Sequence, residues 1–190
     1  MTQYRIVVVG GSWGGVRAAG VVLAGLPAAF GVPIVMVLHR SPASDEEAFV
    51  SALQRQTALR VTEGADKMAI AAGSVYVAPA GYHLLVEGEA LALSTEEAVN
   101  HSRPSIDVLF ESAAEEYENG AVAVVLTGAN ADGAKGLARI REAGGYAVVQ
   151  DPAGAERPEM PRAAIATAGA DRIVDLDGMA PLLLELCGAL

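Results

Sequence analysis

Cysteine and histidine are both scarce in this chain. Cys187 is the only cysteine among 190 residues, and there are three histidines. A single cysteine excludes an internal disulfide and is compatible with a reducing, cytoplasmic location. Three histidines are too few for a zinc site built from several imidazoles, and neither Cys-x-x-Cys nor His-Glu-x-x-His occurs. We therefore expect no metal site.

Positive charge and long hydrophobic runs are scarce as well. The chain has 13 Lys and Arg against 23 Asp and Glu, a formal net charge of -10. No basic patch is available to neutralise phosphates, which argues against a nucleic-acid partner. No apolar run reaches the roughly 18 residues of a membrane-spanning helix. The N-terminus leads directly into a strand, so we expect neither a signal peptide nor membrane insertion.

Apolar residues, in contrast, are abundant and regularly placed. They make up 52% of the chain, which suits one domain over residues 1–190 with a sizeable core. Short apolar runs that are typical of buried strands alternate with helical patterns. These runs cover residues 6–9, 32–38, 121–126 and 146–150. The alternation predicts an α/β fold, a three-layer α/β/α doubly wound domain with a mostly parallel sheet.

The middle of the chain has a different character. Strand patterns at residues 74–78 and 83–87 flank the turn Pro79-Ala80-Gly81, and a third pattern follows at 91–94. We interpret them as a small antiparallel portion beside the main sheet. Earlier in the chain, Ser44 and Glu47 have capping-box spacing, which predicts a helix that begins after Ser44.

The most informative stretch is the glycine-rich turn after the first strand, Gly10-Gly-Ser-Trp-Gly-Gly15. It presents Ser12 where a strand ends and a helix begins, at the sheet edge where open α/β folds build their sites. The free N–H groups near Trp13, Gly14 and Gly15 can stabilise an anion there. A nucleophilic serine needs both features, whereas a phosphate-binding loop needs only the second. The stretch alone leaves catalytic, ligand-binding and purely structural interpretations open.

Three polar residues follow three of the predicted strands. Ser12 follows the first, His39 ends the second, and Asp132 lies just beyond the strand that ends at Leu126. The ends of parallel strands share one edge, so a nucleophile, a base and an acid would meet there, as acyl transfer requires. Taken singly, a histidine such as His39 at a strand end is more often a capping or packing residue, and an aspartate such as Asp132 before Gly133 is more often a helix N-cap or turn residue.

Other residues compete for a place in this site. His83 lies in a strand-like stretch and is expected at the rim of the site at most, and His101 lies in a loop. Trp13, the only tryptophan, is either a hydrophobic plug under the sheet edge or a wall of the pocket. Cys187 lies among leucines in the last predicted helix, so we assign it to the core.

A specific resemblance begins at Leu126-Thr-Gly-Ala-Asn-Ala-Asp-Gly-Ala-Lys-Gly136. Further blocks agree in order with the same family and run over nearly the whole chain. They are Gly10–Gly15, His39 with Pro42, Tyr76-Val-Ala-Pro-Ala-Gly-Tyr-His83, Arg103-Pro-Ser-Ile-Asp-Val-Leu-Phe110, Gln150-Asp151 and Met160-Pro-Arg-Ala-Ala-Ile165. Together they resemble the catalytic domain of CheB-type chemotaxis protein-glutamate methylesterases.

This resemblance implies a serine hydrolase with Ser12 as nucleophile, His39 as base and Asp132 as orienting acid. It implies a methylated glutamate on a methyl-accepting chemotaxis receptor as substrate, deamidation of related glutamines, and no cofactor. Trp13, Gly14, Ala129 and Met160 then correspond to the oxyanion and pocket region.

The chain also departs from the family pattern. Trp13 stands where members usually carry threonine, and Ala129 stands where they usually carry methionine. The 190 residues contain no match to the receiver domain that normally controls the esterase, so we expect a separate receiver-domain regulator. These departures favour a second hypothesis, a non-catalytic module that binds a receptor or another protein through the same cleft. A nucleotide-binding domain is a third, because the glycine turn could cradle phosphates.

Overall fold

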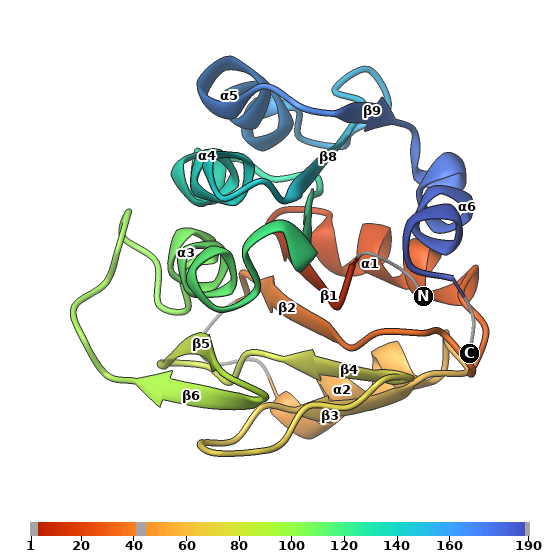
Figure 1. Cartoon of the computed structure of the whole chain (residues 1–190), viewed down its shortest axis with the longest axis vertical. Coiled ribbons are helices and arrows are strands. Elements are labelled where there is room, and N and C mark those ends of the chain that lie inside the picture. Colours follow the sequence, from red (N-terminus) through yellow and green to blue (C-terminus); the bar gives the residue numbers. More distant parts are fainter. Residues whose placement is uncertain (1–3, 41–44, 189–190) are drawn as a thin grey trace.

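The computed structural model describes residues 4–40 and 45–188. Its centre is a seven-stranded sheet in which every strand pair is parallel, in the order β3-β4-β2-β1-β7-β8-β9 (Figure 1). The strands are β1 Ile6–Gly11, β2 Ile34–Leu38, β3 Arg60–Glu63, β4 Ser74–Val77, β7 Ala121–Val125, β8 Tyr146–Gln150 and β9 Arg172–Val174. The predicted α/β fold with a mostly parallel sheet is confirmed.

Helices cover both faces of this sheet and complete the three layers (Figure 1). One core holds the inward faces of α1, α2 and α6, and the other holds those of α3, α4 and α5. The helices are α1 Gly15–Ala24, α2 Glu46–Gln54, α3 Ile106–Tyr117, α4 Ala134–Glu142, α5 Glu159–Ala168 and α6 Leu176–Cys187, with a 3-10 turn at Glu118–Gly120. Strands β1, β2 and β7 are buried along their whole length, which explains their unbroken apolar sequences.

The order of the strands fixes the position of the site. Strands β2, β4 and β3 lie in that spatial order on one side of β1, and the later strands β7, β8 and β9 lie on the other. The strand order therefore reverses beside β1, and open α/β sheets bind ligands outside the carboxyl ends of strands at such a point. Three neighbouring strands, β2, β1 and β7, end there side by side.

Two predictions, one about the middle of the chain and one about the helix before it, need correction. Strand β4 pairs in parallel with β2 and β3, so it belongs to the main sheet and not to an antiparallel portion. Only β5 (His83–Glu87) and β6 (Ala90–Ser94) form an antiparallel pair. Helix α2 is capped by Asp45, whose Oδ1 accepts from Ala48 N at 3.1 Å, so the predicted capping by Ser44 is wrong. Ser44 itself, like Pro42, lies outside the described residues.

Across residues 4–40 and 45–188, we find no helix that combines the length and the hydrophobicity needed to span a membrane.

Cys187, at the end of α6, is buried in the core as predicted, and burial raises the pKa of its thiol to about 12.

Candidate active site

The ends of β1, β2 and β7 bring the three predicted site residues to one edge of the sheet. Backbone hydrogen bonds continue just past the strands: His39 N donates to Gly11 O at 2.9 Å, and Ser12 N donates to Thr127 O at 3.0 Å. The loop after β7 carries the chain from Thr127 to Asp132. The sheet therefore places Ser12 between the segments that carry His39 and Asp132.

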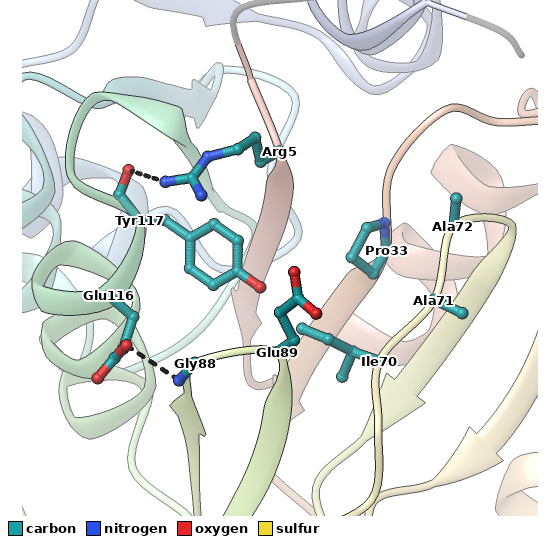
Figure 2. A pocket seen from close by; sticks show the side chains of 9 residues that line it. All are labelled: Arg5, Pro33, Ile70, Ala71, Ala72, Gly88, Glu89, Glu116 and Tyr117. Carbon is teal, nitrogen blue, oxygen red and sulfur yellow. Dashed lines mark hydrogen bonds between the residues drawn. The ribbon is translucent and has the colours of Figure 1, made fainter.

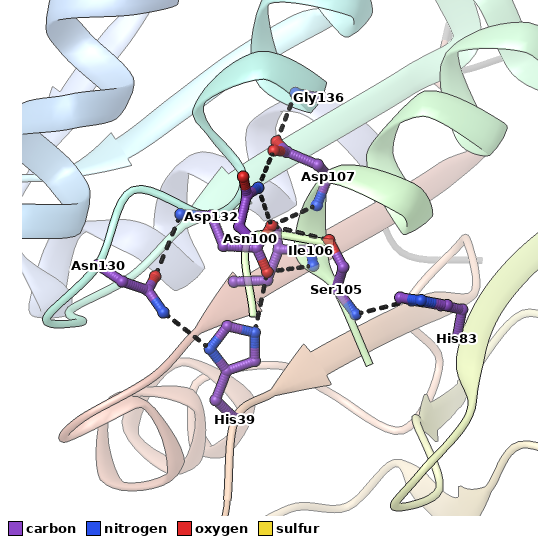
Figure 3. A network of polar contacts seen from close by, with 9 residues as sticks. All are labelled: His39, His83, Asn100, Ser105, Ile106, Asp107, Asn130, Asp132 and Gly136. Atoms are coloured by element: carbon purple, nitrogen blue, oxygen red, sulfur yellow. Dashed lines mark hydrogen bonds and ion pairs between the residues drawn. The ribbon is translucent and has the colours of Figure 1, made fainter. Parts of the chain in front are cut away.

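His39 and Asp132 form a direct pair (Figure 3). His39 Nε2 lies 2.9 Å from Asp132 Oδ2, and the Asp132 side chain is fully buried while that of His39 is 14% exposed. The structure thus brings together the predicted base and the predicted acid. An ionised carboxylate only accepts hydrogen bonds, so the proton of a neutral His39 belongs on Nε2.

Asp132 is held by the first turn of α3 as well as by His39. Its Oδ2 accepts from Ile106 N at 2.7 Å, and its Oδ1 accepts from Ser105 Oγ at 2.8 Å and Asp107 N at 3.1 Å. Burial alone would raise the pKa of the Asp132 carboxyl, but these hydrogen bonds and the one from His39 outweigh it and lower the pKa below its ordinary value. The carboxylate therefore stays charged beside the imidazole.

Helices α3 and α4 hold each other's N-termini through two carboxylates. Asp132, just before α4, accepts from the first N–H groups of α3, while Asp107 in α3 accepts from Gly136 N of α4 at 2.7 Å (Figure 3). Both acids satisfy backbone donors that a helix end leaves unpaired. This reciprocal arrangement fixes Asp132 relative to the sheet.

The other ring nitrogen of His39 faces the loop after β7. Asn130 Nδ2 lies 3.4 Å from His39 Nδ1, and Asn130 Oδ1 accepts from Asp132 N at 3.1 Å (Figure 3). The Ser12 hydroxyl donates to no acceptor within residues 4–40 and 45–188. The nitrogen of a neutral His39 that can accept a proton is Nδ1. In this arrangement it contacts the Asn130 amide and not the Ser12 hydroxyl.

The surroundings of Ser12 are tightly packed on one side. A Cβ added to Gly128 would lie 2.9 Å from Ser12 Cβ and 2.7 Å from both Cε and Sδ of Met160, so only glycine fits there. Met160 is itself buried against this loop. Met160 and Ser12 therefore lie close together across Gly128, and the role of Met160 as a pocket residue stays a prediction.

Free backbone donors lie next to Ser12. Within the described part of the chain, the N–H groups of Trp13, Gly14 and Ala129 donate to no acceptor. Trp13 and Gly14 directly precede α1, and Gly14 adopts the left-handed φ of +75° at its N-cap. Such groups at a helix N-terminus can stabilise negative charge on a ligand.

Trp13 does not plug the sheet edge, because its side chain is 61% exposed. Its indole Nε1 donates to Glu156 Oε1 at 3.0 Å, and the Arg157 guanidinium lies 5.5 Å from the ring centroid. Thr127 Oγ1 lies 3.1 Å from Trp13 O and accepts from Arg157 N at 2.8 Å. The plug interpretation is therefore wrong: Trp13 is a surface residue fixed against the loop before α5.

The remaining histidines do not replace His39. His83 is buried, not at the rim: its Nδ1 accepts from Ser105 N at 3.2 Å and its Nε2 donates to Glu97 O at 3.0 Å. It thus supports the residue that donates to Asp132. His101 is exposed in a tight turn, next to Asn100, whose Nδ2 donates to Asp107 Oδ2 at 2.8 Å.

Comparison with known proteins agrees with this architecture. A family model described as CheB methylesterase matches residues 7–183. The chain belongs to the CheB methylesterase family. It is accordingly a carboxylic ester hydrolase, and the resemblance inferred from the sequence is confirmed.

Several relatives show how far the likeness extends. A Leptospira interrogans protein named for protein-glutamate methylesterase and protein-glutamine glutaminase activities is 47% identical over 97% of this chain and 95% of its own length. Protein-glutamate methylesterase FrzG of Myxococcus xanthus is 38% identical over 96% of this chain but only 54% of its own length. The crystal structure of the Thermotoga maritima CheB methylesterase catalytic domain matches with a TM-score of 0.92 and 31% identity, covering 96% of this chain and 98% of that one.

Several residues around this CheB-type site escape sequence reasoning. Ser105, Asn130 and Thr127 all contact site residues, but the sequence gives only weak signals for them. Ser105 directly precedes α3, a position that favours serine as a helix cap, yet its hydroxyl bonds to Asp132 instead of its own helix. Only the folded arrangement reveals these contacts.

A separate pocket of about 330 Å³ lies away from this site (Figure 2). Arg5 and Pro33, which line it, directly precede β1 and β2, so it opens at the amino edge of the sheet. Within this pocket, Arg5 Nη2 donates to Tyr117 O at 3.1 Å.

No group of three or more His, Cys, Asp or Glu residues among residues 4–40 and 45–188 could hold a metal ion.

Proposed function

We propose that this CheB-family hydrolase removes methyl groups from glutamate methyl esters of a protein substrate, with Ser12 as nucleophile, His39 as base and Asp132 as orienting acid. The observation that carries the proposal is the buried His39–Asp132 pair, 2.9 Å between Nε2 and Oδ2, at the strand ends that also present Ser12. The names of the Leptospira and Myxococcus relatives support the substrate class.

In the first step, Ser12 Oγ attacks the ester carbonyl carbon while its proton moves to His39 Nδ1. Nε2 stays bonded to Asp132, whose negative charge stabilises the imidazolium. The carbonyl oxygen becomes an oxyanion, which the free N–H groups of Trp13 and Ala129 can stabilise. Collapse of this intermediate breaks the bond to the methoxy group, and the proton on Nδ1 leaves with it as methanol.

In the second step, water attacks the glutamyl ester of Ser12, and His39 accepts one of its protons. The second tetrahedral intermediate collapses to a free glutamate and returns the proton to Ser12 Oγ. The same sequence with an amide substrate releases ammonia from glutamine, which is the second activity in the name of the Leptospira relative. Ser12 is half-buried and its neighbour Trp13 is exposed, which supports the approach of a protein surface to the reacting serine.

The proposed partner is the cytoplasmic region of a methyl-accepting chemotaxis receptor, so the reaction would take place in the cytoplasm. A separate receiver-domain protein is the proposed regulator. The chain spans about half the length of FrzG, and the rest of that protein has no counterpart in this sequence.

Methanol release from a methylated receptor fragment tests this function. We expect release by the wild-type chain and a loss of several orders of magnitude in Ser12→Ala. Ser51→Ala, on helix α2, is the matched serine control and should keep full activity. Equal release by Ser12→Ala and wild type would contradict the assignment. No release, with Ser12 still labelled by a small phosphonate ester, would mean a hydrolase of another substrate.

A further inference from the structure

The amide of Asn130 has one orientation that satisfies its neighbours. Its Oδ1 accepts from Asp132 N at 3.1 Å, and because a backbone N–H is only a donor, this atom must be the amide oxygen. The amide nitrogen then faces His39, with Nδ2 3.4 Å from Nδ1 (Figure 3). The backbone therefore settles which end of the amide meets the imidazole.

The state of His39 follows from its other partner. Asp132 is a buried carboxylate that accepts from Nε2, so a neutral His39 carries its proton on Nε2 and its lone pair on Nδ1. The Asn130 amide is thus a donor aimed at the lone pair. This contact is a hydrogen bond only while His39 is neutral.

We propose that Asn130 holds the substrate-free protein in a resting state by donating to His39 Nδ1 in competition with the Ser12 hydroxyl. The inference rests on the proposed function, in which this same lone pair takes the serine proton. Two observations support it: Asn130 contacts Nδ1, and the Ser12 hydroxyl has no acceptor among the residues described. Asn130 is a positioning residue that must release Nδ1 before Ser12 can attack.

The resting contact is weak enough to be broken during turnover. At 3.4 Å it is longer than an ordinary N–H hydrogen bond, and with a neutral imidazole it joins two uncharged groups. Substrate entry next to Ser12 only has to turn the amide away from the ring. Asn130 also stabilises the loop, because its Oδ1 accepts from Asp132 N. A useful variant must keep this hydrogen bond while it removes the contact with His39 Nδ1.

Asn130→Ser separates the two roles. A serine hydroxyl can still accept from the N–H two residues on, as in an ST turn, but it is too short to donate to His39. We expect Asn130→Ser to react with a small phosphonate ester at Ser12 about two- to tenfold faster than wild type, the range that a neutral hydrogen bond implies. Asn119→Ser, at an exposed position without side-chain hydrogen bonds in the described chain, is the matched control and should leave the rate unchanged.

An unchanged or slower reaction in Asn130→Ser, with thermal unfolding at the wild-type temperature, would overturn the proposal. Nitrogen NMR of His39 gives a readout that does not depend on activity. We expect Nε2 to carry the proton and the Nδ1 signal to move toward that of an unbonded nitrogen in Asn130→Ser. A proton on Nδ1 in the wild type, or an unmoved Nδ1 signal, would overturn it too. If the wild type reacts with no phosphonate, the proposed function fails, and the NMR result still decides the role of Asn130.

Discussion

Asp132 is the residue on which most polar contacts of the site converge. Its two oxygens accept from His39, Ser105, Asn100 Nδ2 and two backbone N–H groups of α3. A buried charge is tolerated only when such donors surround it, and here they also leave the carboxylate a single orientation. The orientation of His39 therefore depends on residues that never approach the substrate.

Ser105 offers a test of this dependence. Ser105→Ala removes the 2.8 Å donor to Asp132 Oδ1, so we expect about 1–3 kcal/mol less free energy of unfolding, because a hydrogen bond to a buried charge is lost. We also expect a roughly tenfold lower kcat for ester hydrolysis with little change in KM. Urea unfolding and steady-state kinetics measure the two effects.

Ser112→Ala is the matched control for that experiment. Ser112 is buried in α3, the helix that begins directly after Ser105, and its hydroxyl donates to Leu109 O and accepts from Val86 N, away from Asp132. It should lose stability without losing kcat. A kcat for Ser105→Ala equal to that of Ser112→Ala would show that the Ser105 hydroxyl does not position Asp132.

At the scale of elements, the sequence predicted most strands and helices because their apolar patterns are strong. The placement of Ser12, His39 and Asp132 at strand ends also followed, since parallel strands end on one edge. The pairing of β4 did not follow, because a four-residue strand carries no signal for its partners. Contacts of Asn130 and Ser105 depend on how loops and α3 meet, which no local pattern encodes.

Strand β3 and helix α2 meet at a pair of carboxyl groups that makes stability depend on pH. Burial, followed by the neighbouring Glu46, raises the pKa of Glu63 to about 7, whereas the hydrogen bond from Ala80 N helps to lower the pKa of Glu46. Glu63 therefore binds its proton more tightly in the folded state than in the unfolded state. Its contribution to stability is complete below its ordinary pKa and is lost as the pH rises through about 7.

Glu63→Gln should remove this pH dependence. We expect the unfolding temperature of the wild type to fall between about pH 5 and pH 8 by more than that of the variant, because glutamine has no proton to lose. Thermal unfolding at the two pH values measures it. Glu47→Gln changes an exposed carboxylate of the same helix and should behave like wild type. Parallel pH curves for wild type and Glu63→Gln would contradict the assignment.

At the scale of the whole molecule, the candidate site and the contacts around Arg5 lie at opposite edges of the sheet. The carboxyl edge holds the site, while the amino edge holds the pocket around Arg5, where the first strand meets the end of α3 (Figure 2). Arg5 donates to Tyr117 O and lies 4.9 Å from the centroid of the Tyr117 ring. These contacts join elements far apart in the chain, so their role is in stability.

Arg5→Ala should therefore lower stability without changing catalysis. We expect a loss of about 1–2 kcal/mol in the free energy of unfolding, from one hydrogen bond and one cation–π contact. The kcat/KM for ester hydrolysis should stay at the wild-type value below the unfolding temperature. Chemical unfolding and kinetics on the same preparation test both parts. A reduced kcat/KM in fully folded Arg5→Ala would show that the two edges are coupled.

The proposed function depends above all on the activation of Ser12 by His39, which would make Ser12 the nucleophile of this CheB-family hydrolase. Mass-spectrometric mapping of the adduct formed with a small phosphonate ester tests it most directly. We expect one adduct, on Ser12, whose formation slows by several orders of magnitude in His39→Gln while the fold is retained. An adduct on another residue, or labelling of Ser12 at an equal rate in His39→Gln, would contradict it.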